Sequence, residues 1–124
     1  MRLRSLVLVA SLLALSATAC SGGGGGDTKD CTDLTNSGST FTIHIQGFAF
    51  QPSCFKASAS QSISIVNGDD AVHSFTIQGT SVDVDVPANQ TLDGGSISGA
   101  VKPGTYTFVC RYHPDMKGTV IVTS

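Results

Sequence analysis

The segment TYTFVCRYHPDMKGTVIVT, residues 105–123, contains two runs of β-branched and aromatic residues separated by a short polar loop. Such runs favour β-strands, and a proline in the loop is typical of a turn. The segment therefore predicts two strands with a tight connection between them, at 105–110 and 119–123. Cys110, His113 and Met116 follow one another along this connection at intervals of three residues.

Four further runs upstream have a similar composition, and several of them alternate in polarity. They are FTIHIQ (41–46), SISIV (62–66), VHSFTIQ (72–78) and SVDVDV (81–86). Turn residues separate these runs, and the region shows no sustained helical period. Short strands with frequent turns predict an all-β fold, a Greek-key antiparallel β-sandwich.

Because side chains alternate along a strand, the pattern also predicts which way each one points. His73 shares a face with Phe75, and Cys110 shares a face with Phe108. Both should therefore point toward the core at the end of a strand. His44 alternates with apolar neighbours, and we expect it to be an ordinary exposed histidine.

A thiolate, two imidazoles and a thioether form a ligand set suited to copper. We expect Cys110, His113 and Met116 to supply three of these groups and His73 to supply the second imidazole. The backbone N–H of Ser74 is a candidate hydrogen-bond donor to the thiolate. Taken one at a time, these residues also fit ordinary core positions, and their joint spacing favours the metal site.

These features resemble the cupredoxins, the small blue copper proteins, and most closely the plastocyanin and amicyanin branch. The resemblance is carried by FAFQPSCFKASASQSISIVNGDDAVHSFTI (48–77) and KPGTYTFVCRYHPDMKGTVIV (102–122). It implies one type 1 copper ion with equatorial ligands His73, Cys110 and His113 and axial ligand Met116. It also implies that His113 lies near the surface within an apolar patch. Ser74 departs from the asparagine that many members carry after the first histidine.

We therefore expect an exported one-electron carrier that cycles between Cu(I) and Cu(II), not an enzyme, and a monomer that meets redox partner proteins transiently. Copper storage or delivery without redox turnover is the alternative. A second alternative is a purely structural β-sandwich that binds no metal. A Cys–His nucleophile would need a third group to orient the histidine, and a nitrite reductase or multicopper oxidase would need more histidines and a second domain.

The N-terminus reads MRLRSLVLVASLLALSATAC, two arginines followed by an apolar stretch too short to span a bilayer. It predicts a secretory signal at 1–19. Cys20 then suggests a lipid-anchored protein on the periplasmic or outer face of the cell membrane, with plain cleavage as the alternative. The glycine-rich segment 20–39 should be a flexible tether to a copper-binding domain at 40–124.

The remaining cysteines and the charge narrow the prediction further. In an oxidising compartment, Cys31 and Cys54 are expected to form a disulfide, and the alternative is two free thiols. Without the signal, five basic residues stand against nine aspartates. A nucleic-acid-binding protein would need a basic stripe, so we expect no such partner. A lipid at Cys20 would be the only membrane contact.

Overall fold

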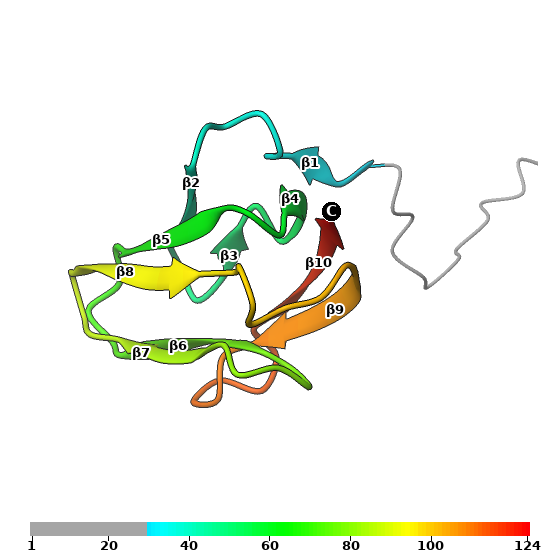
Figure 1. Ribbon diagram of the computed structural model, residues 1–124. Coiled ribbons are helices and arrows are strands. Elements are labelled where there is room, and N and C mark those ends of the chain that lie inside the picture. The colour runs from blue at the N-terminus through cyan, green and yellow to red at the C-terminus, as the bar shows by residue number, and fades with distance from the viewer. Residues whose placement is uncertain (1–29) are drawn as a thin grey trace, which may run out of the picture.

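The computed structural model describes residues 30–124 (Figure 1). The predicted signal segment, the predicted acylation site Cys20 and the first part of the predicted tether lie outside the described residues. Within the described range, the structure contains no helix with the length and apolar character of a membrane span.

Residues 30–124 form ten strands, which Figure 1 labels in chain order. They are β1 (Thr32–Asp33), β2 (Thr40–Ile45), β3 (Phe50–Gln51), β4 (Cys54–Ser58), β5 (Ser62–Asn67), β6 (His73–Ile77), β7 (Asp83–Val86), β8 (Thr91–Ser96), β9 (Gly104–Val109) and β10 (Lys117–Thr123). Over this range the all-β prediction is confirmed.

The strands form a six-stranded sheet in the order β1-β4-β10-β9-β6-β7 and a four-stranded sheet in the order β3-β2-β5-β8. The expected β-sandwich is thus present, but its sheets are mixed and not purely antiparallel. β4 runs parallel to β1 and β10, and β2 runs parallel to β5. β2 and β5 are parallel because the chain between them passes through β4 in the other sheet before it returns.

All six predicted strands are present, with bounds shifted by at most two residues at either end. The prediction missed β1, β3, β4 and β8. The TLDGGS sequence of β8 has two glycines and a single large apolar residue, which gives a weak strand signal. It is a strand because it pairs with β5 at the edge of its sheet.

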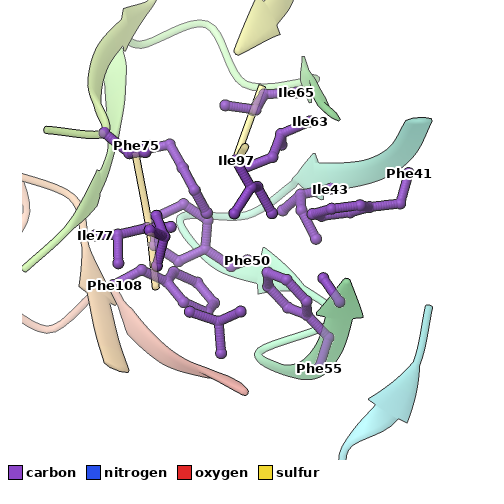
Figure 2. Packing of buried hydrophobic residues seen from close by; sticks show 14 of the residues in the cluster. Phe41, Ile43, Phe50, Phe55, Ile63, Ile65, Phe75, Ile77, Ile97 and Phe108 are labelled. Atoms are coloured by element: carbon purple, nitrogen blue, oxygen red, sulfur yellow. The ribbon is translucent and has the colours of Figure 1, made fainter. Parts of the chain in front are cut away.

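The core lies between the sheets and shows the predicted alternation. In β2 the residues alternate between exposed and buried, and His44 is exposed as expected. Phe108 on β9 packs against three other rings at centroid distances of 5.0 to 5.4 Å, those of Phe50, Phe55 and Phe75 (Figure 2). Such aromatic pairs are each worth about 0.5–1.5 kcal/mol beyond the area they bury. They fix β9 two residues before Cys110.

β10 passes very close to this aromatic cluster. A methyl group at Gly118 would lie 2.3 Å from Cζ of Phe108 and 2.3 Å from the carbonyl oxygen of Ser53. Only a residue without a Cβ lets the backbone approach so closely. β10 can therefore begin against the core immediately after the loop.

A disulfide joins Cys31 to Cys54, the pairing expected from the sequence. Cys31 immediately precedes β1, and Cys54 begins β4, with which β1 pairs. The described chain is therefore tied to the six-stranded sheet from its first few residues.

We predict that the double substitution Cys31→Ser with Cys54→Ser lowers the free energy of unfolding of the metal-free protein by about 3 kcal/mol, since the bridge closes a loop of 23 residues. Urea denaturation measures the difference. A reductant should bring the wild-type protein to the midpoint of the variant, which is the control. Equal midpoints under oxidising conditions would contradict the prediction.

Candidate metal centre

Three donor atoms from two strand ends and one loop converge at one end of the sandwich. His73 begins β6, Cys110 directly follows β9, and His113 lies in the loop before β10. Nδ1 of His73 is 3.1 Å from Nδ1 of His113. Sγ of Cys110 is 3.8 Å from Nδ1 of His73 and 3.4 Å from Nδ1 of His113.

These separations fit three ligands of one ion. A metal such as zinc binds imidazole nitrogen at about 2.0–2.1 Å and thiolate sulfur at about 2.3 Å. Three donor atoms that lie 3.1 to 3.8 Å apart could all reach one ion at such distances. Two imidazoles and one thiol are donors that suit a soft or borderline metal ion such as copper.

The donors differ in their exposure to water. The side chains of His73 and Cys110 are 0% and 2% exposed, whereas His113 is partly exposed. Met116 is buried and lines a hollow of about 270 Å³ together with Phe48, His113 and two loop residues, Pro114 and Asp115. The structure therefore brings His73, Cys110 and His113 together, with Met116 in the wall of the adjacent hollow.

Hydrogen bonds within the loop explain why the three-residue spacing gathers these side chains. The N–H of Cys110 donates to the carbonyl of Met116, and the N–H of Met116 donates to the carbonyl of His113, both at 2.9 Å. Lys117 then pairs with Val109 as the two strands resume their ladder. The loop is closed on itself, so its donors lie on one side of a compact turn.

Ser74 connects the strand of the first histidine with the ligand loop. Its N–H donates to Sγ of Cys110 at 3.3 Å, the contact expected from the sequence. Its Oγ accepts the N–H of Arg111 at 2.8 Å. The β6–β9 ladder pairs Thr76 with Val109, the last residue of β9, so Ser74 lies two positions beyond the end of the ladder, opposite Arg111. The backbone N–H groups of Ser74 and Arg111 therefore donate to side-chain atoms and not to the carbonyls of a continued ladder.

The network extends from Ser74 to the protein surface. Oγ of Ser74 lies 3.2 Å from Oγ1 of Thr76, which donates to Asp83 at 2.7 Å. Arg111 donates from Nε to the same carboxylate at 2.8 Å and also pairs with Asp85. These contacts fasten the first residue of the loop to the edge strand β7.

Two residues at the site were not predicted from the sequence. Oδ2 of Asp69 lies 2.9 Å from Nε2 of His73, and the ring of Phe48 meets both imidazoles edge to face, with centroids 5.2 and 4.9 Å away. An aspartate four residues before a candidate ligand was the available signal for Asp69. For Phe48 the sequence held no local signal, since its partners lie 25 and 65 positions away.

Asp69 is a buried carboxylate with a full set of partners. Burial opposes its ionisation, but the N–H groups of Phe48 and Gly47 and the imidazole of His73 outweigh that effect. Together they hold the pKa of Asp69 below its ordinary value. A negative charge therefore stands behind the more buried imidazole.

Two known proteins are similar to this chain, one in sequence and one in structure. Amicyanin-alpha of Methylorubrum extorquens is 31% identical over 97% of this chain and 99% of its own length. Amicyanin of Paracoccus versutus matches 77% of this chain and 88% of its own, with a TM-score of 0.52 and 18% identity.

A larger protein contains the same fold as one part. The copper-containing nitrite reductase of Thermus scotoductus matches 68% of this chain with a TM-score of 0.56 and 20% identity. The match covers 22% of the reductase chain. This likeness concerns the fold alone.

A family model described as the cupredoxin-like domain matches residues 5–122, nearly the whole chain. The sandwich, the relative over its full length and this match agree with one another. The chain therefore belongs to the cupredoxin-like family and is a member of the amicyanin and plastocyanin type.

Proposed function

We propose that this protein is a one-electron carrier with a single type 1 copper ion, held by His73, Cys110 and His113 and by Met116 as axial ligand. The observation that carries the proposal is the convergence of two Nδ1 atoms and one sulfur within 3.8 Å of one another. Copper bound there would supply the Cu(I)/Cu(II) couple. Mutants of amicyanin with a similar fold have structures in a Cu(I) form and in an oxidised form.

The residues that hold the site suit such a couple because they are hard to displace. His73 and Cys110 extend from neighbouring strands of one sheet, and the Ser74 N–H bond to sulfur fixes their separation. A frame that keeps its geometry in both oxidation states lowers the cost of moving an electron. Burial of both side chains keeps water away from the thiolate and from the inner imidazole.

The partly exposed His113 provides a route for the electron to the surface. The exposed large hydrophobic residues of the described chain are Phe48, Val72 and Tyr112. Phe48 contacts both imidazoles, and the other two adjoin His73 and His113 in sequence. This apolar rim, made of Phe48, Val72 and Tyr112, would support brief contacts with a redox partner protein, because such interfaces are small.

We propose a carrier and not an enzyme, and a monomer exported from the cytoplasm. The signal pattern at 1–19 and Cys20 supports anchoring by lipid on the outer face of the membrane. The Cys31–Cys54 bridge is in keeping with an oxidising compartment such as the periplasm.

The first test is the visible spectrum of the copper-loaded protein. Wild type should be intensely blue when oxidised and should bleach reversibly on reduction, because a thiolate bound to Cu(II) gives charge transfer. Cys110→Ser should lose the band entirely, whereas His44→Gln, which alters an exposed histidine of β2, should keep it. A blue Cys110→Ser variant would refute the ligand set, and a colourless wild type that still binds copper would favour storage or delivery.

The second prediction concerns the apolar rim. Phe48→Asn should slow electron self-exchange about tenfold, the effect of weakening the encounter by about 1.4 kcal/mol. Asparagine tolerates the φ of 59° found at this position. NMR line broadening in mixtures of oxidised and reduced protein measures the rate. Thr40→Asn, at the far end of β2, is the control, and an equal rate in all three proteins would exclude the rim from electron exit.

The third prediction concerns the junction between β6 and the loop. Ser74→Ala should lower the free energy of unfolding of the metal-free protein by about 1 kcal/mol, since the N–H of Arg111 loses its acceptor. Thermal or urea denaturation measures the change, and Ser81→Ala, at an exposed turn position, is the matched control. If the two variants unfold at the same midpoint, the Ser74 hydroxyl does not hold the loop.

A further inference from the structure

Asp69 is a buried carboxylate outside the proposed ligand set. Its side chain is 7% exposed, and a buried charge is tolerated only when hydrogen bonds replace its water. Oδ1 accepts the N–H of Gly47 at 2.7 Å, and Oδ2 accepts the N–H of Phe48 at 2.8 Å. Oδ2 also lies 2.9 Å from Nε2 of His73. The carboxylate thus joins one turn of the backbone to one imidazole.

This contact decides which nitrogen of His73 carries the proton. An ionised carboxylate can only accept hydrogen bonds, so Nε2 of His73 must be the donor. In the neutral imidazole Nδ1 then has a free lone pair. That Nδ1 faces Sγ of Cys110 and Nδ1 of His113, the position in which a metal ligand needs its lone pair.

Within residues 30–124, the second imidazole has no equivalent support. In the part of the chain that the structure describes, His113 makes its polar side-chain contacts through Nδ1, with His73 and Cys110. Among the described residues, a charged group is hydrogen-bonded to the far side of the His73 ring and not to that of His113.

The same carboxylate holds the aromatic ring that covers the site. The turn from Gln46 to Ala49 is closed by two backbone hydrogen bonds between these residues, and Phe48 within it has a φ of 59°. Asp69 binds the N–H groups of Gly47 and Phe48, so the ring stands nearly perpendicular to both imidazoles, at 84° and 87°. Orientation of His73 and placement of Phe48 therefore depend on one side chain.

We propose that Asp69 is a positioning residue of the copper site, which fixes the Nε2–H tautomer of His73 and favours Cu(II) over Cu(I). This inference rests on the proposed function. A negative charge hydrogen-bonded to the far side of the imidazole makes Nδ1 a stronger donor and stabilises the more positive ion more. A purely structural role, holding the turn alone, would weaken both oxidation states equally.

The first experiment uses the metal-free protein, so it does not depend on copper. Nitrogen-15 NMR of the imidazoles reports the tautomer of His73 in wild type, Asp69→Asn and Asp70→Asn. Asp70 carries the same charge one residue further on and bonds to the side chain of Asn89. Wild type and Asp70→Asn should show Nε2–H alone, and Asp69→Asn should show a large share of Nδ1–H. Nδ1–H in wild type would overturn the proposal even if Asp69→Asn failed to fold.

The second experiment measures the affinities for Cu(I) and Cu(II) by competition with chelators, together with the reduction potential. Asp69→Asn should lower the affinity for Cu(II) about 10- to 100-fold, the usual loss when such a partner is removed. The loss of affinity for Cu(I) should be about tenfold smaller than the loss for Cu(II). Each tenfold difference between the two losses raises the reduction potential by about 59 mV. Asp70→Asn should show a smaller shift.

The outcomes separate this inference from the proposed function. Equal losses for both oxidation states, with an unchanged potential, would reduce Asp69 to a structural role and overturn the proposal. A wild-type protein that binds no copper would refute the proposed function, while the tautomer measurement would still show whether Asp69 orients His73.

Discussion

The hydrogen bond from the Ser74 N–H to the Cys110 sulfur exists because β6 and β9 are neighbours in one sheet and β9 ends first. Where the ladder stops, a backbone donor of β6 has no carbonyl opposite it and meets a thiol instead. Beyond the end of β9, the backbone N–H of Arg111 likewise lacks a carbonyl from the ladder. The side-chain oxygen of Ser74 accepts its hydrogen bond. The position of the donor cluster is therefore set by where β9 ends. The sheet fixes the distances between the donors that its strands carry.

The aromatic core and the site depend on the same strand. Phe108 is locked among three other rings, and Cys110 follows it on the same side of β9. His73 precedes Phe75 on β6 in the same way, and the rings of Phe75 and Phe108 lie 5.1 Å apart. The packing of these rings in the core therefore also fixes the distance between the two buried donors, His73 and Cys110. The loop then has to place only His113 and Met116.

The sequence predicted what depends on local pattern. The alternation in β2, β5 and β6 reveals strands and the direction of His73, and the spacing of Cys110, His113 and Met116 reveals a loop whose own hydrogen bonds gather them. Strand β8 was not predicted, because its pairing with β5, and not its composition, makes it a strand. The same holds for the partners of His73: Asp69 looked like a turn residue, and Phe48 comes from the other sheet's connection, so only the folded arrangement places them there.

Gly118 separates the ligand loop from the scaffold. A side chain at this position would strike both the ring of Phe108 and the backbone at Ser53, so β10 must start with bare backbone against the core. Between the contacts of Arg111 with β7 and this glycine, the loop is closed by its own backbone hydrogen bonds. Residues 112 to 116 can therefore be treated as a cassette: an engineer who exchanges them for a segment with other donors should leave Arg111 and Gly118, at its two ends, untouched.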